Sequence, residues 1–574
     1  MQVADTEVKA TGSPPGIKVF AALAVIVAAG LAAHGLILLS DYILWDGWGY
    51  SHWLGERAEL VHLERLFREI GRPLDILFWI PFIGVKEMQL HAKYAGVATW
   101  ILSACLMYLV LLRSRFTSPS AALMCGVLAT ILPVFDVLGE LAIWMNTACV
   151  ALFWAGWWVL VSMPSRGALA WLCRAIGLGL FFLSFNLNSQ LVYFYAFAVC
   201  LVAVNLFQDG AKPVWAAASR TVLRYADFAV LPIVFWTWKR MFTPNSGYYE
   251  GYNNPAFTFE LLSRTGVSLF SGFLADEARA LFESPLWFVV SLIIVVLCVL
   301  LAVRRGVRFP VAGSPRQGVF LFLAGGLLLF AGAFSYAVVD QSFSASGWLT
   351  RNCILLALPL SMLLVGALIL VGARFFPHRP GLVWSMVALI ALMGIGSSNR
   401  GILRWQAFGA KQESIGIKLR AAFMDKAPSF VQLRDYFLIR NTIYYYPPIV
   451  WTYLLARGLP TPKTFVIETA QIAPDELFVD ALGTPQRRVT VLNGNAQAVE
   501  QAIEQTTMPY AMAEIPRHGL QALAIVEPTE MGNDGVALGW EYLKTRWLQP
   551  GLIPQFLERL TSVQVQELPS IPAD

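Results

Sequence analysis

The stretch IKVFAALAVIVAAGLAAHGLILLSDYILWD (residues 17–46) places a long apolar run directly before two aspartates. The run from residue 17 to residue 40 is as long as the roughly 20 apolar residues that a helix needs to cross a bilayer. It is too long for the core of a signal peptide, and no convincing cleavage site follows it. The stretch therefore predicts a retained membrane anchor, preceded by a polar cytoplasmic tail of residues 1–16.

The composition of the whole chain extends this interpretation. Hydrophobic residues make up 57% of the sequence and charged residues only 14%, whereas soluble domains have about 45–50% and about 25%. The excess must face lipid, because long apolar runs recur along the chain. The net charge of +5 is small, and its basic residues form short clusters between the runs, which argues against a nucleic-acid partner. The seven cysteines lack metal-ligand spacing and are expected to be buried apolar residues.

The apolar runs predict a mainly α-helical, polytopic membrane bundle of about eleven spans. Basic residues should stay in the cytoplasm, and with the N-terminus inside, every predicted inside loop is basic. The C-terminal part after residue 397 then lies outside. The predicted spans are 17–40, 91–112, 119–135, 141–162, 170–186, 190–207, 226–241, 286–303, 317–338, 352–373 and 382–397.

The first outside loop, residues 41–90, is predicted to contain two helices that do not cross the membrane. ERAELVHLERLFREI (56–70) has apolar residues at helical spacing and charges over the remaining surface, which indicates an amphipathic surface helix. Gly71 and Pro73 should end it. RPLDILFWIPFIG (72–84) is apolar but too short to span, so we expect an interfacial helix.

The segment of residues 398–574 differs in kind from the bundle. TPKTFVIET and QRRVTVLNG are typical of strands, and NAQAVEQAIEQT and LIPQFLERLT are typical of helices. The segment is long enough for its own core. We therefore predict a membrane domain over residues 17–397, followed by a small soluble α/β domain.

Asp41 and Asp46 are the first candidates for chemistry. Both follow the first span and lie among aromatic residues. A carboxylate at this boundary can act as a general base that takes a proton from an attacking hydroxyl. The alternatives are structural: Asp41 as a cap of the first span, and Asp46 as a cap or turn residue helped by Gly47 and Gly49.

The sequence resembles the GT-C superfamily of membrane glycosyltransferases, in particular bacterial members of the O-antigen glucosyltransferase type. The resemblance rests on an acidic residue soon after the first span, on a first loop with two membrane-parallel helices, and on GRPLDILF (71–78). The resemblance covers residues 17–397. It implies a polyprenyl-phosphate-linked sugar donor, a glycan or lipid acceptor, an inverting transfer, and a bacterial inner membrane with the C-terminal domain in the periplasm. Asp46 would be the base by position. The two acids are five residues apart rather than adjacent, so Asp41 stays the alternative.

Such a transfer needs positive charge for the leaving phosphate. Arg351, in SGWLTRNCILL, begins a span from the outside, where its guanidinium can bind a phosphate bidentately or extend to water. Arg72 is a second candidate. Lys239 and Arg240 end a span on the outside, against the charge rule, and are therefore also candidates for phosphate contact.

Two further outside loops complete the predicted site. Asp136 and Glu140, in DVLGE, form a second acidic loop that either joins the site or caps helices. These carboxylates would suit Mg²⁺ or Mn²⁺ weakly, and we predict no required cofactor. PNSGYYEGYNN (244–254) has Tyr248, Tyr249 and Tyr252, whose rings suit stacking on sugars in a lid, or it is simply a loop rich in turn formers.

Two other functions remain open. An O-antigen polymerase or ligase also works on a lipid-linked glycan, but with a diphosphate donor and a histidine in a large outside loop, and the 242–285 loop has no histidine. A transporter would need charges deep in the spans or broken helices in matched halves, and few mid-span charges are found.

Overall fold

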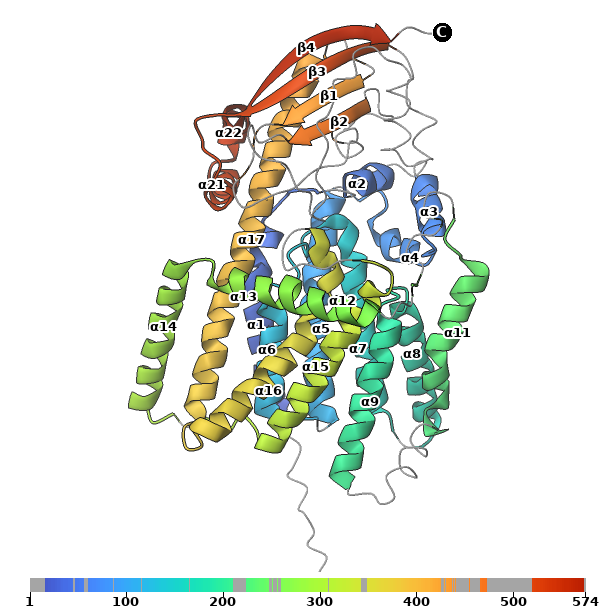
Figure 1. The fold of residues 1–574 in the computed structure, drawn as a ribbon, viewed down its shortest axis with the longest axis vertical. Coiled ribbons are helices and arrows are strands. Elements are labelled where there is room, and N and C mark those ends of the chain that lie inside the picture. The colour runs from blue at the N-terminus through green and yellow to red at the C-terminus, as the bar shows by residue number, and fades with distance from the viewer. Residues whose placement is uncertain are drawn as a thin grey trace, which may run out of the picture.

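The protein is a helical membrane protein with a small sheet near its C-terminus. The computed structural model describes residues 16–44, 47–55, 60–85, 87–114, 116–164, 166–209, 223–246, 250, 255–256, 260–307, 309–341, 348–424, 428, 430–435, 437, 439, 454, 465–471 and 519–571. In Figure 1 the long helices stand side by side in the lower part, and the sheet lies above them. The predicted fold class is confirmed.

Each of the eleven predicted spans coincides with a helix. Within the described ranges, seven helices are long and apolar enough to cross a membrane, namely α1, α5, α7 with the short η3 before it, α14, α15, α16 and α17. Helices α6, α8 and α9 are apolar but shorter, and α11 contains Pro232. Their bounds are α1 Gly16–Leu38, α5 Met88–Arg113, α6 Pro119–Ile131, η3 Leu141–Ile143, α7 Trp144–Ser162, α8 Ala168–Ser184, α9 Gln190–Asp209, α11 Ala226–Phe242, α14 Pro285–Arg304, α15 Pro315–Ala337, α16 Ala357–Phe375 and α17 Pro380–Ala422.

Local sequence signals explain where several helices begin and how closely they pack. Ser314 caps α15 in a capping box with Gln317. Gly325 of α15 and Gly366 of α16 lie where the two helices approach so closely that a Cβ would come within 2.6 Å of Leu363 N and 2.5 Å of Phe322 N. Small residues at such a crossing are typical of helix pairs in membranes.

The connection between the first two spans forms the predicted short helices over its described residues. Helix α3 (Leu60–Glu69) corresponds to the amphipathic segment, and its buried face includes Leu63 and Phe67. A turn at Gly71 ends it, and α4 (Asp75–Trp79) with η2 (Ile80–Phe82) forms the short apolar helix. Helix α2 (Gly47–Gly55) comes before them, and all three lie at the sheet side of the bundle (Figure 1).

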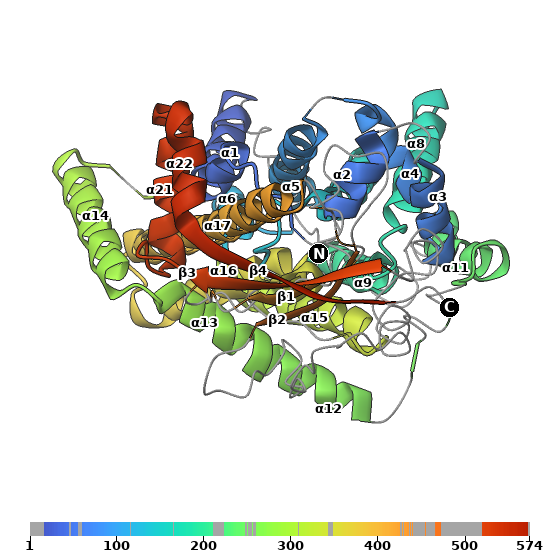
Figure 2. The ribbon, with the colours of Figure 1, turned by 90° about the horizontal axis from the view of Figure 1, so that it is seen from above.

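A second group of helices runs across the bundle rather than along it. Helix α12 (Glu260–Val267), the π-helical turn η5 (Ser268–Leu274) and α13 (Ala275–Phe282) follow one another, and both views show them crossing the spans (Figures 1 and 2). Helix α14 follows at the edge of the molecule in Figure 2. Its outer face exposes large apolar residues, among them Leu286, Ile293 and Leu300, as expected of a surface that faces lipid.

Over its described residues, the C-terminal part contains a four-stranded sheet with strand order β2-β1-β3-β4. Strand β1 (Phe430–Asp435) pairs in parallel with β2 (Phe465–Gln471) and β3 (Gly519–Pro528), and β3 pairs antiparallel with β4 (Thr561–Ile571). The predicted strand TPKTFVIET overlaps β2, and the predicted helix LIPQFLERLT overlaps α22 (Ile553–Leu560). QRRVTVLNG and NAQAVEQAIEQT lie outside the described residues.

Helix α17 connects the membrane bundle to this sheet without a break. It continues past residue 397, where the predicted span ends, as far as Ala422. Helix α21 (Gly535–Leu548), followed by η7 (Pro550–Leu552), packs along it, and Gly539 lies so close that a Cβ would be 1.9 Å from Leu403 O. Ser414 of α17 hydrogen-bonds Thr561 Oγ1 at 2.7 Å. The C-terminal part is therefore anchored on the extension of a span.

Candidate functional site

Asp41 lies in the connection between α1 and α2. Its Oδ1 accepts a hydrogen bond from Nε2 of Gln406 at 3.0 Å, and its Oδ2 accepts one from the Tyr542 hydroxyl at 3.2 Å. Arg546 forms an ion pair with Oδ2. Gln406 belongs to α17, and the other two belong to α21. Asp41 thus joins three segments, and both of its oxygens already have donors.

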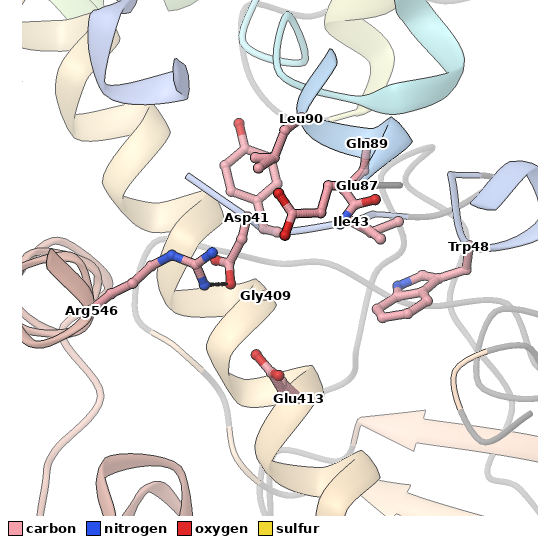
Figure 3. A pocket seen from close by; sticks show the side chains of 10 residues that line it. Asp41, Ile43, Trp48, Glu87, Gln89, Leu90, Gly409, Glu413 and Arg546 are labelled. Atoms are coloured by element: carbon pink, nitrogen blue, oxygen red, sulfur yellow. Dashed lines mark hydrogen bonds and ion pairs between the residues drawn. The ribbon is translucent and has the colours of Figure 1, made fainter. Parts of the chain in front are cut away.

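A cavity of about 230 Å³ opens beside Asp41. Figure 3 shows the ion pair of Asp41 and Arg546 on one side, Glu413 projecting from α17, and Trp48 of α2 across the cavity. Glu87, which precedes α5, also lines it. Carboxylates accept hydrogen bonds, a guanidinium donates them, and an indole ring packs against apolar faces. This lining suits a small ligand rich in hydroxyl groups.

The second acidic loop lies against the segment that contains Asp41. Glu140 is 1% exposed, and its Oε2 accepts a hydrogen bond from Leu44 N at 3.0 Å. Asp136 lies against α17, where a Cβ on Gly401 would be 2.3 Å from its Oδ1. Burial raises the pKa of Tyr42 well above its usual value, and the charges of Asp136 and Glu140 raise it further. The two predicted acidic segments are therefore neighbours.

Glu277 of α13 adds a carboxyl group that the sequence analysis did not identify. Its side chain is 3% exposed, and neither oxygen has a hydrogen-bond partner among the described residues. Burial raises its pKa well above the usual value, and the charges of Asp136 and Asp276 act in the same direction. The transverse helix α13 therefore brings an acid close to the second acidic loop.

A separate buried cluster forms around Arg72. Its Nε lies 2.9 Å from Asp75 Oδ2, and its Nη2 donates to Asn146 Oδ1 at 3.0 Å. Asn186, in the turn between α8 and α9, donates to the other oxygen of Asp75. Asp75 is fully buried. Arg72 is thereby held by two partners, and its guanidinium has a fixed orientation.

Two more of the predicted phosphate-binding residues lie near Arg72. Lys239 is within electrostatic reach of both Arg72 and Asp75. A Cβ added to Gly71 would lie 3.4 Å from Cε of Lys239, and the φ of +66° at this position favours glycine. Arg351 lies in η6 (Trp348–Cys353). Both Arg351 and Arg72 are within electrostatic reach of the Tyr336 hydroxyl. Arg72 and Lys239 thus both act on the buried Asp75, and Arg351 is connected to this cluster through Tyr336.

The same region contains a buried amide without a partner. Gln190, the first residue of α9, is 0% exposed, and neither side-chain atom has a hydrogen-bond partner among the described residues. The neighbouring Ser189 donates to the Tyr336 hydroxyl at 3.3 Å. A buried amide with unused donors next to a basic cluster is suited to an additional polar ligand.

Arg240 lies at the edge of the cluster around Arg72. It is within electrostatic reach of Lys239, and its guanidinium lies 5.6 Å from the ring centroid of Trp236 on the exposed side of α11. Asp46, Tyr248, Tyr249 and Tyr252 lie outside the described residues, so their predicted roles stay predictions. No three metal-ligating side chains converge within the described ranges. Glu140 accepts hydrogen bonds from two backbone amides, Leu44 N at 3.0 Å and Ala142 N at 3.4 Å.

The buried Asp75 predicts a pH dependence for anion binding. Burial raises its pKa from 3.8 to about 6, although Arg72 and Lys239 oppose the shift. Because the pKa of Asp75 is higher in the folded state, this group adds to the free energy of unfolding below about pH 3.8. The contribution is lost as the pH rises through 6. Below pH 6 the neutral Asp75 no longer offsets the cations. We expect a phosphodiester to bind about five to ten times more tightly at pH 5.5 than at pH 7.5, as measured by titration calorimetry. The dependence should vanish in Asp75→Asn, and an equal dependence in that variant would contradict the assignment.

Several of these site residues were missed because nothing in their local sequence distinguishes them. Asn146 is a single amide in apolar surroundings, Asn186 is one of several amides in the short turn FNLNSQ (185–190), and Arg546 lies on a helix that no motif marks. Asp75 had a usable signal, because it follows Arg72 by three residues within the same break segment, a spacing at which helical neighbours meet.

Comparisons with known proteins show a distant structural similarity. No family model matches the chain, and no curated protein matches it. Among solved structures, the chain is similar to the archaeal oligosaccharyltransferase AglB from Archaeoglobus fulgidus, solved in complex with an inhibitory peptide and a dolichol-phosphate. The TM-score is 0.31 and the identity 12%, over 94% of this chain and 72% of that one. Similarity at this level does not establish a function, which must be inferred from the site itself.

Proposed function

We propose that this protein is a GT-C-type membrane glycosyltransferase. It transfers a sugar from a polyprenyl-phosphate-linked donor to a hydroxyl of a glycan or lipid acceptor at the outer face of a bacterial inner membrane. The observation that carries the proposal is the basic cluster in which Arg72 and Lys239 act on Asp75 while Arg72 and Arg351 act on Tyr336. Arg72 belongs to the same connection between α1 and α5 as Trp48 and Glu87 of the carboxylate-lined cavity.

The basic cluster suits the leaving group of such a reaction. A sugar phosphodiester carries one negative charge, and a second develops on the phosphate as the glycosidic bond breaks. Donors fixed in place before the reaction stabilise this charge best. Arg72 is held by Asp75 and Asn146, so it is already oriented. We assign Arg72 and Arg351 to the phosphate, with Lys239 as a supporting charge and Arg240 as a peripheral one.

The cavity suits the acceptor. Its carboxylates can accept hydrogen bonds from hydroxyl groups, and Trp48 offers an apolar face. We assign the general base to Asp46, because both oxygens of Asp41 are occupied by Gln406, Tyr542 and Arg546. Asp46 would take the proton of the acceptor hydroxyl as that hydroxyl attacks the sugar carbon.

Helix α2 supports an arrangement in which donor and acceptor meet. Trp48 lines the cavity. Tyr50, two residues later, is within electrostatic reach of Arg72, and its ring centroid lies 5.1 Å from that of Trp79. An inverting displacement requires the nucleophile and the leaving group on opposite faces of the sugar carbon. A sugar beside α2 would have the acceptor on the cavity side and the phosphate on the Arg72 side. Tyr248, Tyr249 and Tyr252 remain the proposed lid.

The test is donor dependence in purified protein reconstituted into nanodiscs. We expect transfer from a polyprenyl-monophosphate sugar to a glycan acceptor, with an inverted anomeric configuration in the product as read by NMR. Transfer only from a lipid-diphosphate glycan would instead indicate a polymerase or ligase. Solute counterflow in proteoliposomes without any sugar transfer would indicate a transporter and contradict the proposal.

A further inference from the structure

The chain between α1 and α2 is held by a buried lysine of α5. Lys93 is 1% exposed, and its Nζ donates to Ser40 O at 3.3 Å and to Tyr42 O at 2.5 Å. The same ammonium group lies 3.7 Å from the ring centroid of Tyr42. The two carbonyl acceptors flank Asp41 in the sequence. One side chain therefore fixes the backbone on both sides of that residue.

Glu140 holds the next part of the same segment. Its Oε2 accepts from Leu44 N at 3.0 Å, and its Oε1 accepts from Ala142 N at 3.4 Å. A Cβ on Gly47 would be 2.3 Å from Glu140 Oε1. The carboxylate therefore contacts the backbone at Leu44 and Gly47, the two described residues nearest to Asp46 in the sequence.

The two buried groups also act on each other. The charge of Glu140 is within electrostatic reach of Lys93, and both side chains are almost fully removed from solvent. Burying two opposite charges costs desolvation energy that their attraction seldom exceeds, and apolar residues of similar size often serve stability as well. Stability alone therefore does not account for this pair. Apolar residues could not form the hydrogen bonds that Lys93 and Glu140 make to the backbone of residues 40–44.

We propose that Lys93 and Glu140 are positioning residues that fix the backbone of residues 40–44 and Gly47 for catalysis. This inference rests on the proposed function, in which the base is Asp46, between Leu44 and Gly47 in the sequence. Catalysis is sensitive to placement, because a displacement of about 1 Å can cost about a hundredfold in rate. Lys93 and Glu140 touch the backbone rather than the substrates, so their removal should lower kcat and leave the KM for the donor unchanged.

The experiment uses Lys93→Met, Glu140→Leu and the double variant. Each single variant leaves one buried charge without its partner, so part of any loss reflects lower stability. The double variant removes both charges and should fold like the wild type. We expect its kcat to be about 100-fold lower, with the donor KM within twofold. Amide hydrogen exchange in residues 40–47 should become faster. The matched control is Arg174→Met with Asp227→Asn, an ion pair between α8 and the first turn of α11, which should leave kcat and this exchange unchanged.

Two results would overturn the inference. One is a double variant with wild-type stability and full kcat. The other is a loss of activity that merely follows the loss of folded protein. If the wild type transfers no sugar, the proposed function fails, and the exchange measurement then decides alone: unchanged exchange in residues 40–47 of the double variant would show that the two side chains do not fix this segment.

Discussion

Asparagine in place of Asp46 is expected to lower sugar transfer by about 10² to 10⁴-fold, because it removes the proposed general base. Asparagine is nearly isosteric with aspartate, so donor and acceptor affinities should stay close to those of the wild type. The measurement is kcat with a polyprenyl-monophosphate sugar in nanodiscs, with folded protein quantified by thermal unfolding. Unchanged transfer would remove Asp46 from the mechanism.

Asp41→Asn is the matched control, and it addresses which of the two acids is catalytic. Asp41 is engaged by Gln406, Tyr542 and Arg546. Asparagine keeps an acceptor oxygen but loses the ion pair with Arg546, so α21 should dock less firmly. We expect less than about a tenfold loss of kcat, since a partly exposed ion pair contributes about 1 kcal/mol. If the order of the two effects is reversed, Asp41 is the base.

The second large effect is expected for Arg72→Met. Methionine fills much of the same space, but it leaves the fully buried Asp75 without its cation. Removing one partner of a buried ion pair costs about 3–5 kcal/mol, so the variant should unfold at a markedly lower temperature. It should also lose donor binding, because the oriented guanidinium is the main contact proposed for the phosphate.

A second substitution separates these two consequences of Arg72→Met. In the double variant with Asp75→Leu no charge is left unpaired, so stability should return to near that of the wild type. Donor affinity should stay low, as measured by titration with a short-chain polyprenyl phosphodiester. Restored stability together with restored donor affinity would show that Arg72 only balances Asp75 and does not bind the phosphate.

The membrane fold could be predicted from the sequence because a bilayer imposes a simple requirement. Each span must be a continuous apolar helix of sufficient length, and every predicted span corresponds to a helix. The end of the last span was the exception, since α17 runs on to Ala422. The sequence becomes more polar after residue 397, which is why the predicted span ends there. No helix-breaking proline follows at that point, so the helix itself continues.

The candidate site was predictable in its parts but not in its arrangement. Lys239 and Arg351 were selected because each lies at a predicted outer end of a span, and Arg72 because it lies in the break segment of the first loop. That Arg72 and Lys239 act on the same aspartate depends on helix packing, which no local pattern encodes. Arg546 shows the same limit more strongly, because its contact with Asp41 joins the first loop to the C-terminal part. Long-range contacts of this kind become visible only in the folded chain.

The uninterrupted α17 also sets how far the parts that pack on its extension stand from the membrane. At 1.5 Å per residue, its 43 residues extend about 65 Å, whereas the hydrocarbon core of a bilayer is about 30 Å thick. Roughly half of this helix is therefore available to set the height of the sheet above the lipid. The C-terminal part docks on this half at Leu403 and Ser414, and Gly409 and Glu413 of the same half line the cavity. The length of α17 between the bilayer and these residues therefore sets the height of both the sheet and the proposed acceptor cavity above the lipid.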